Sequence, residues 1–498
     1  MTQGQPMKLF HINQSLYAFH FMFGIALKMA DTDEALKKSL SSFSIDSLKP
    51  EQRQILDILV ERKDCLVILP TGFGKSLPFH VFLPVIREIR ADFNQSVMLV
   101  CCPLVALMQD QVAKLTTIKS VSAAYIGSSV ESDARILNGE IDIIYASPER
   151  VINDAGWREG ITKLKVCSIV IDEFHTIATW GEDISGLNKQ AFRKWFAFVG
   201  ELRSLFPQAN VVALSATCTQ KIKKRVMKQL CFGPNTVEIF KSPNKANIKL
   251  SVCKVSNELE IAMSWLVDGL KQLAGDFPKT LLYCYSINDV SKLYSYFSKE
   301  LDEETFGSLI DMFHSETPPS KKEEIVKFLG DKTNSSKKRL VICTNALGMG
   351  IDVSNCCSVI LFGMPDNIVD LVQEIGRIGR NGEQSIAMIL FNSYHLRRLN
   401  KDMKEILCSS DCRRLNIMRH FLMDSDLKEL KKDTGVHTCC DICQKGCKCD
   451  NCELLLLERL LENEVLTDTD STCSDNSENT EDCWESIFAS ELNFNLEI

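Results

Sequence analysis

The sequence contains no run of roughly eighteen consecutive apolar residues, the length expected of a helix that crosses a bilayer. The nearest stretch, residues 16–30, is interrupted by His20 and Lys28. It also lacks the basic start and the small-residue cleavage site of a secretory signal. We therefore predict no membrane association, and we interpret residues 1–38 as a weakly specified N-terminal extension.

The C-terminal part of the sequence lacks positive charge. No Lys or Arg occurs from residue 466 to residue 498, whereas nine acidic residues do. Without these nine negative charges, the net charge of −8 becomes +1 for the rest of the chain. A nearly neutral protein can carry a basic groove for nucleic acid, but its net charge alone does not demonstrate one. We predict that residues 456–498 form an acidic, disordered tail, in which residues 483–494 are a candidate helix for a protein partner.

Cysteine is abundant, with twenty-one residues, but it is not arranged as a disulfide framework. Cys65, Cys167, Cys284 and Cys343 stand singly inside apolar runs, as reduced core residues do. This pattern indicates a reducing compartment. The sequence has no internal repeat of solenoid period, so it does not encode a repeat array.

The apolar runs form two series, and a chain of 498 residues is too long for one ordinary core. In each series, short β-rich runs alternate with helical patterns, which is typical of a parallel sheet covered on both faces. The first series comprises residues 65–70, 96–103, 141–147, 166–173 and 210–217, and the second comprises residues 280–286, 339–345, 356–363 and 385–392. We predict two tandem α/β domains, residues 39–240 and 241–395, with a linker at 241–250.

A glycine-rich stretch, "LPTGFGKSLPF" at residues 69–79, follows the first of these runs. At the start of a helix its backbone N–H groups can converge on a phosphate, with Lys75 as a point charge and the Ser76 hydroxyl as a ligand of Mg²⁺. The residues predicted to bind a nucleotide here are Thr71, Gly72, Gly74, Lys75 and Ser76. The alternative is an ordinary strand-to-helix turn, because Leu69 stands where the full motif has its first glycine.

An acidic pair, Asp172 and Glu173, ends a second apolar run. Alone, such a pair is more often a solvated strand end. Ligands of open parallel sheets gather at the carboxyl ends of the strands, where the Lys75 loop is also predicted to lie. We therefore predict that Asp172 holds Mg²⁺ and that Glu173 orients or deprotonates an attacking water.

Two arginines, Arg377 and Arg380, lie three residues apart in "QEIGRIGRNG", residues 373–382, which places them on one face of a helix or turn. Arginines from a neighbouring domain commonly neutralise charge on a transferring phosphoryl group. The alternative is a surface helix with two basic residues.

Clustered cysteines follow the second domain, and residues 396–455 are predicted to form a small zinc-binding helical subdomain. Short cysteine spacings near a distant cysteine are typical of structural zinc sites. The predicted ligands are Cys412, Cys439, Cys440 and Cys443. Two alternatives remain open: His437 could replace Cys439, and the "CKCDNC" stretch at 447–452 could take the metal instead.

Taken together, these motifs resemble those of superfamily-2 helicases of the RecQ type, over roughly residues 43–452. The order of the short stretches, more than any one of them, carries the resemblance. They are Phe43 with "LKPEQRQIL" (48–56), "PLVALMQDQV" (103–112), "YASPER" (145–150), "LSAT" (214–217), "YCYS" (283–286) and "FHSETPPSKKEEIVKFL" (313–329). The zinc segment is most similar to that of the Werner-syndrome branch, which also has adjacent cysteines.

The resemblance implies two RecA-like domains that use ATP, Mg²⁺ and Zn²⁺ and move 3′→5′ on single-stranded, tailed or branched DNA. It implies a place in DNA repair or recombination in the nucleus. Gln52 would read the adenine edge, and Arg380 would face the γ-phosphate with Arg377 as an auxiliary. The residues implied to contact DNA or to couple hydrolysis to movement are Ser147, Arg150, His175, Trp180, Ser215, Thr217 and Thr344.

The resemblance weakens after Trp180 and Gly181, where the family's Phe, Arg and Pro are replaced by Ile184, Ser185 and Gly186. Because that loop is thought to report bound DNA to the ATP site, coupling of hydrolysis to unwinding is in question. Three functions remain: a helicase that unwinds duplexes, an ATP-driven translocase with weak unwinding, and a non-enzymatic, zinc-stabilised DNA-binding protein. The intact Lys75 and Asp172 argue against the third.

Overall fold

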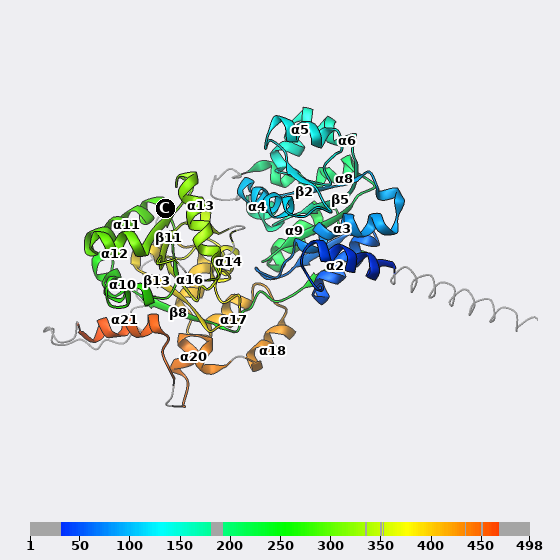
Figure 1. Cartoon of the computed structure of the whole chain (residues 1–498). Coiled ribbons are helices and arrows are strands. Elements are labelled where there is room, and N and C mark those ends of the chain that lie inside the picture. The colour runs from blue at the N-terminus through cyan, green and yellow to red at the C-terminus, as the bar shows by residue number, and fades with distance from the viewer. Residues whose placement is uncertain are drawn as a thin grey trace, which may run out of the picture. The chain divides into compact units, whose positions relative to one another are not determined.

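The computed structural model describes residues 31–180, 193–333, 336–348, 351, 353–433, 435–449 and 452–467. The chain divides into two compact units between Ser242 and Pro243 (Figure 1). Among the described residues, no helix has both the length and the apolar character needed to cross a membrane.

The first unit is built on a seven-stranded sheet whose strands all run parallel, in the order β3-β4-β2-β5-β6-β1-β7. Most of its strand residues are buried on both faces, which is why they read as continuous apolar runs. The strands are β1 Cys65–Ile68, β2 Ser96–Cys101, β3 Ala123–Tyr125, β4 Ile143–Ala146, β5 Lys165–Ile171, β6 Asn210–Ser215 and β7 Val237–Phe240. The helices include α2 Pro50–Val60, α3 Leu77–Ile89, α4 Val105–Thr116, α5 Val130–Leu137, α6 Ala155–Thr162, α7 His175–Trp180, α8 Leu202–Leu205 and α9 Gln220–Gln229.

The helices cover both faces of this sheet and form two cores. Along β1, Cys65 and Val67 enter one core while Leu66 and Ile68 enter the other. Residues 31–42 are helical and contribute Leu36 and Leu40 to the first core. Part of the segment that we expected to be a weakly specified extension, from residue 31 on, is therefore helical and packed, because these leucines recur at helical spacing.

The second unit contains a six-stranded parallel sheet in the order β10-β11-β9-β12-β13-β8. The predicted class, two tandem parallel-sheet domains, is confirmed. The strands are β8 Ile248–Lys254, β9 Thr280–Cys284, β10 Ile310–Phe313, β11 Leu340–Cys343, β12 Ser358–Phe362 and β13 Ser385–Phe391. The helices around it include α10 Leu259–Leu273, α11 Ile287–Glu300, α12 Glu303–Leu309, α13 Pro319–Gly330, α14 Ile368–Ile375, α15 Ser393–Arg398 and α16 Lys401–Cys408.

A cysteine-rich segment and a last helix attach to β8, the edge strand of this sheet. The segment contains α17 Arg413–Met418, α18 Asp424–Asp433, α19 Val436–Cys439 and α20 Asp441–Lys445, and α21 Leu456–Thr467 follows it. Cys440 forms an isolated parallel bridge with Leu250 of β8. An edge strand exposes unpaired backbone groups, so this contact covers part of a surface that would otherwise invite association.

Helix α21 begins at residue 456, where the disordered tail was expected to start. Leu457 is fully buried in the core of the second unit, and Leu460 packs against it. The Glu458 carboxylate lies 2.7 Å from the Lys249 ammonium on β8, and both side chains are buried. The tail prediction thus needs a later boundary, because acidic composition does not reveal that one face of this helix is apolar.

We predict that Glu458→Ala lowers the free energy of unfolding by about 3–5 kcal/mol, because it leaves the buried Lys249 ammonium without its ion-pair partner. Denaturant unfolding of the full chain measures this change. Glu453→Ala, at an exposed position three residues before Leu456, is the matched control and should change stability by less than about 0.5 kcal/mol. Equal effects of the two substitutions would contradict a buried, stabilising pair.

Candidate nucleotide and metal sites

The predicted phosphate loop joins β1 to α3, whose N-cap is Ser76. Gly72 and Gly74 have positive φ angles of 79° and 85°, a backbone conformation that L side chains rarely adopt. At Gly74 there is also no room, because an added Cβ would lie 2.7 Å from Gln52 Nε2. The glycines therefore allow the backbone to turn tightly at the start of α3, where N–H groups favour anions.

Gln52 of α2 supports this loop through hydrogen bonds to its backbone. Its Nε2 donates to the carbonyl oxygens of Phe73 and Gly74 at 3.1 and 3.0 Å, and its Oε1 accepts the backbone N–H of Lys49 at 2.9 Å. The side chain is only 4% exposed. In this structure, the side-chain amide that was predicted to read adenine is hydrogen-bonded to the backbone of the phosphate loop.

Asp172 and Glu173 follow β5, at the same edge of the sheet as the phosphate loop. Only β6 separates β5 from β1 in the sheet, and all three strands run parallel. Burial, reinforced by the neighbouring Glu173 carboxylate, raises the pKa of Asp172 to about 7, while the Lys75 ammonium acts in the opposite direction. Two carboxylates that repel one another beside a phosphate loop form a donor set that fits a divalent cation such as Mg²⁺.

A chain of buried polar contacts connects Glu173 to the end of β6. His175 Nδ1 lies 3.3 Å from Glu173 Oε2 and 2.9 Å from Ser215 Oγ. The Ser215 hydroxyl in turn donates to the carbonyl oxygen of Thr217 at 2.9 Å. Three of the residues predicted to couple hydrolysis to movement, Thr217, Ser215 and His175, therefore form a chain of contacts that ends at the predicted general base.

Glu173 itself has a positive φ of 48°, which is uncommon for a residue with a side chain. Its backbone N–H donates to its neighbour Asp172 at Oδ1, 3.0 Å away. Strained backbone of this kind persists where the surroundings fix it, often at functional sites. Here the strain accompanies the turn between β5 and α7 that directs the two carboxylates.

Arg193 was missed by the sequence analysis because no motif contains it. Its guanidinium makes two hydrogen bonds to the Glu149 carboxylate, at 2.7 and 2.6 Å, and donates to the carbonyl oxygen of Pro103. It thereby joins the loops after β2 and β4, and the second of these loops holds Ser147 and Arg150, which were predicted to contact DNA or to couple hydrolysis to movement. Of the residues predicted there, Ser147 is partly buried, and Arg150 is half exposed and lies 3.6 Å from Asp154.

Trp180 is the last residue of α7. The altered loop that follows it, including Ile184, Ser185 and Gly186, lies outside the described residues. In the second unit, Thr344 follows β11, is 6% exposed and accepts a hydrogen bond from the backbone N–H of Ala346 at 3.3 Å. In this structure its hydroxyl therefore caps a short helical turn.

Arg377 and Arg380 lie in the turn that follows α14, which ends at Ile375. Arg377 is 6% exposed and donates to the carbonyl oxygen of Ile351 at 3.1 Å. Gly379, between the arginines, has a φ of 60°. The structure thus brings the two arginines together in a tight turn, which we call the arginine turn (residues 376–383).

Lys245 and Asn247, in the stretch interpreted as a linker, hold the arginine turn. Lys245 Nζ donates to the carbonyl oxygens of Gly376 and Ile378 at 2.8 and 2.9 Å. Asn247 Nδ2 donates to those of Gly379 and Glu383 at 3.0 and 2.7 Å. Burial, followed by the charges of Arg380 and Arg377, lowers the pKa of Lys245 to about 8. The hydrogen bonds to Gly376 and Ile378 thus hold the Lys245 ammonium close to the positive charges of Arg377 and Arg380.

The four predicted zinc ligands come together, and their four sulfur atoms all lie within 4.8 Å of one another. Cys412 is the N-cap of α17, Cys439 ends α19, and Cys440 is the N-cap of α20. The sulfurs of Cys412 and Cys439 are 3.4 Å apart. His437 belongs to a different group of ligands, so the set in which it replaces Cys439 is not the one that the structure assembles.

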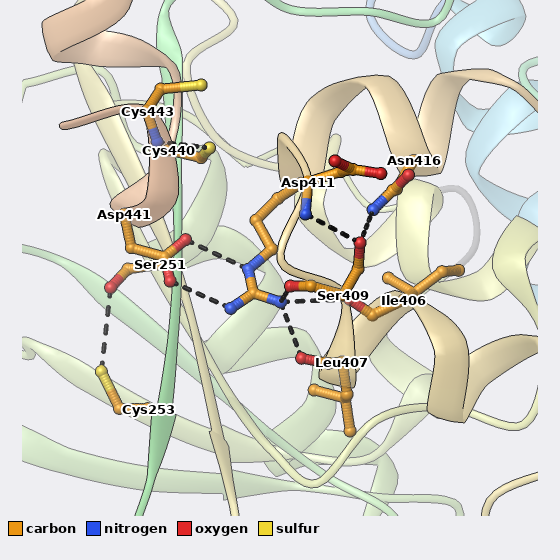
Figure 2. Close-up of polar contacts among 11 residues, drawn as sticks. Ser251, Cys253, Ile406, Leu407, Ser409, Asp411, Asn416, Cys440, Asp441 and Cys443 are labelled. Carbon is orange, nitrogen blue, oxygen red and sulfur yellow. Dashed lines mark hydrogen bonds and ion pairs between the residues drawn. The ribbon is translucent and has the colours of Figure 1, made fainter. Parts of the chain in front are cut away.

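Arg413 of α17 joins this helix to α20 through Asp441, which Figure 2 shows near Cys440 and Cys443. Its guanidinium makes two hydrogen bonds to the Asp441 carboxylate, at 3.2 and 3.1 Å, and donates to the carbonyl oxygens of Leu407 and Ser409 at 2.6 and 3.1 Å. Thiolate-rich tetrahedral sets are typical of structural zinc. The four cysteines are therefore a candidate zinc site held by a buried ion pair.

The family described as DEAD/DEAH box helicase matches residues 49–225, and the helicase conserved C-terminal domain matches residues 263–382. The first match spans the phosphate loop and the acidic pair, and the second ends within the arginine turn.

Two curated relatives are similar over most of this chain. One is the bifunctional 3′-5′ exonuclease/ATP-dependent helicase WRN of Mus musculus, 29% identical over 81% of this chain and 28% of its own length. The other is the ATP-dependent DNA helicase RecQ of Pasteurella multocida, 28% identical over 79% of this chain and 56% of its own length. The chain thus spans between about a quarter and just over half of these relatives.

Solved structures share the fold. Mss116p bound to ssRNA and AMP-PNP superposes with a TM-score of 0.59 at 18% identity, covering 77% of both chains. The DUF1998 helicase MrfA bound to DNA gives a TM-score of 0.57 at 18% identity, covering 80% of this chain and 60% of its own.

We predict that Lys75→Ala reduces turnover of a nucleoside triphosphate to below about one hundredth, because a preorganised charge aimed at the phosphates is worth roughly 10²–10³ in rate. Steady-state phosphate release measures it, and circular dichroism should show an unchanged fold. The control is Lys63→Ala, because Lys63 is exposed and lies just before β1. This variant should keep the turnover of the unchanged chain. Normal turnover by Lys75→Ala would remove the assignment of this loop.

Lys245→Met should lower kcat about tenfold, equivalent to about 1.4 kcal/mol, while leaving KM for the nucleotide unchanged. The reason is that Lys245 fixes the arginine turn without belonging to the phosphate loop. Lys254→Met, at the exposed end of β8, is the matched control and should leave both constants unchanged. A rise in KM with unchanged kcat would show that Lys245 does not act through the arginines.

Proposed function

We propose that this chain hydrolyses ATP to drive movement along DNA, because the chain belongs to the RecQ-type superfamily-2 helicases. The single observation that supports this most strongly is the convergence at one sheet edge of Lys75, Asp172 and Glu173. A non-enzymatic DNA-binding protein would have no use for a partly buried carboxylate pair beside a phosphate loop.

In the proposed reaction, the backbone of the loop from Thr71 to Ser76 cradles the phosphates and Lys75 supplies a positive charge to them. Ser76 and Asp172 would hold Mg²⁺, which when bound supplies charge neutralisation on the phosphate oxygens. Glu173 orients the attacking water and takes its proton. Gln52 keeps the loop in shape through its two hydrogen bonds to loop carbonyls.

Arg380 is proposed to be the principal arginine that stabilises charge on the transferring phosphoryl group, with Arg377 as an auxiliary. Such arginines contribute roughly 10³–10⁵ in rate. The contacts of Arg377 support the auxiliary role, because its guanidinium already donates to Ile351 and its side chain is buried. Arg380 is the more exposed of the two.

The chain of contacts from Glu173 through His175 to Ser215 and Thr217 is proposed to couple hydrolysis to movement, because it links the general base to the next strand end. Ser147, Arg150 and Thr344 are proposed to contact DNA phosphates. Phosphate contacts carry little sequence information, so binding should be sequence-tolerant and should weaken as salt rises.

The proposed substrates are single-stranded DNA and tailed or branched duplexes, with movement in the 3′→5′ direction and a role in repair or recombination in the nucleus. The names of the relatives, ATP-dependent DNA helicases, support DNA as the nucleic acid. Zn²⁺ at Cys412, Cys439, Cys440 and Cys443 is proposed to stabilise the fold without taking part in the chemistry. A protein partner for the acidic tail remains part of this proposal.

A second candidate function is an ATP-driven translocase that separates strands poorly. The loop after Trp180 favours it, because Ile184, Ser185 and Gly186 replace the residues through which relatives of this type are thought to sense DNA. Restoring Phe, Arg and Pro at these three positions should then raise stimulation by DNA without changing turnover in its absence.

The experiment that tests the proposal measures ATP turnover with and without single-stranded DNA, beside separation of a 3′-tailed duplex. A helicase should show stimulated turnover and should separate the strands in the presence of ATP, but not on a duplex with a 5′ tail. Stimulated turnover with little separation would select the translocase. Binding of DNA with no turnover in either condition would overturn both.

A further inference from the structure

A second group of metal-ligating side chains lies in the cysteine-rich segment, apart from the four cysteines already described. It consists of His437, Cys447, Cys449 and Cys452, and one ligand atom from each lies within 4.8 Å of the others. The two groups share no residue, so they do not compete for one position. Each group supplies the four ligands that a closed, tetrahedral structural zinc site requires.

The separations between donor atoms fit one small ion. His437 Nδ1 lies 3.1 Å from the sulfur of Cys452, 3.2 Å from that of Cys449 and 3.4 Å from that of Cys447. The sulfurs of Cys449 and Cys452 are 3.5 Å apart. Tetrahedral zinc, with bonds of about 2.3 Å to sulfur and about 2.0 Å to nitrogen, holds such donors about 3.5–3.8 Å apart. These four separations lie within about half an ångström of the values for tetrahedral zinc.

Neither core packing nor a disulfide accounts for this gathering of side chains. Burial in a core does not, because His437 and Cys449 are exposed and Cys447 and Cys452 are only partly buried. A disulfide does not, since none of the three cysteines is disulfide-bonded and the 3.5 Å between the sulfurs of Cys449 and Cys452 exceeds the bond length of about 2.05 Å. Residues 446–449 and 452–455 contain no helix or strand, so regular secondary structure does not order this stretch.

We propose that His437, Cys447, Cys449 and Cys452 bind a second zinc ion, so that the cysteine-rich segment carries two metals. The ligands of the two sites interleave along the chain, because His437 on α19 precedes Cys439 of the first site by two residues. The short helix α19 therefore contributes to both sites.

The second ion would close the stretch between α20 and α21. Gln444 of α20 and Glu458 of α21 both contact the Lys249 ammonium on β8, so the two helices meet at one buried cation. A metal bound by Cys447, Cys452 and His437 of α19 would link this stretch to α19. The unconstrained chain between Gln444 and Glu458 would then be shorter. The metal's role is structural, and it favours docking of α21 by reducing the conformational freedom of the connection.

The test is the zinc content of the purified full chain, measured by elemental mass spectrometry against protein concentration. We expect two zinc ions per chain, and one in the double variant Cys449→Ser/Cys452→Ser. The matched control is Cys408→Ser, which lies four residues before Cys412, belongs to neither group and should retain two ions. In cobalt-substituted protein, the double variant should lose about three sevenths of the thiolate-to-metal absorption, because three of seven thiolates belong to the second site.

A second pair of variants keeps the test decisive if the double variant fails to fold. His437→Cys offers four thiolates and should retain two ions after dialysis against a weak chelator, whereas His437→Ala should retain one. One zinc per wild-type chain would overturn the proposal. So would a Cys449–Cys452 disulfide detected as a mass two daltons lower, or retention of two ions by the Cys449→Ser/Cys452→Ser variant.

Discussion

The second unit depends on the hydrogen bonds made by one short stretch of chain, residues 244–249. Lys245 and Asn247 bind four carbonyl oxygens of the arginine turn. The same stretch is also bound by the cysteine-rich segment: the Arg414 guanidinium of α17 donates to the Asn244 side chain at 2.7 Å and to the carbonyl oxygen of Lys245 at 2.8 Å. At the end of the stretch, the Lys249 ammonium donates to Gln444 of α20 and to Glu458 of α21. The arginine turn, the cysteine-rich segment and the last helix therefore share a single scaffold.

This arrangement gives the cysteine-rich segment a part in the proposed chemistry that needs no contact with the nucleotide. Arg414 is 4% exposed and also donates to the carbonyl oxygen of Cys439, one of the candidate zinc ligands. A metal bound at the candidate zinc site would fix Cys439 and, through it, Arg414. Arg414 contacts residues 244–248, and these hold the turn that carries Arg380. A misplacement of about 1 Å at a catalytic group can cost about a hundredfold in rate, so such support has functional value.

The fold class could be predicted because parallel strands buried on both faces leave continuous apolar runs, as in residues 65–70 and 385–392. The placement of the glycine-rich loop and the acidic pair at one edge of the sheet could be predicted, because parallel strands bring their carboxyl ends to the same edge. Contacts between distant residues were beyond prediction: Lys245 lies 131 residues from Gly376, and its sequence neighbourhood resembles any polar linker. The division of the ligands into two groups was likewise hidden, since spacing alone allowed His437 or Cys439 in one site.

If residues 244–249 act on catalysis through the arginine turn, a double-mutant cycle on kcat for ATP will show coupling between Lys245 and Arg380. The cycle compares Lys245→Met, Arg380→Ala and the combined variant, with Lys254→Met in place of Lys245→Met as the control. If Lys245 acts by positioning the turn, its loss should cost little in a chain that already lacks the Arg380 guanidinium, and the coupling should reach about 1 kcal/mol or more. Strictly additive effects would show that Lys245 and Arg380 act independently, and would contradict this claim.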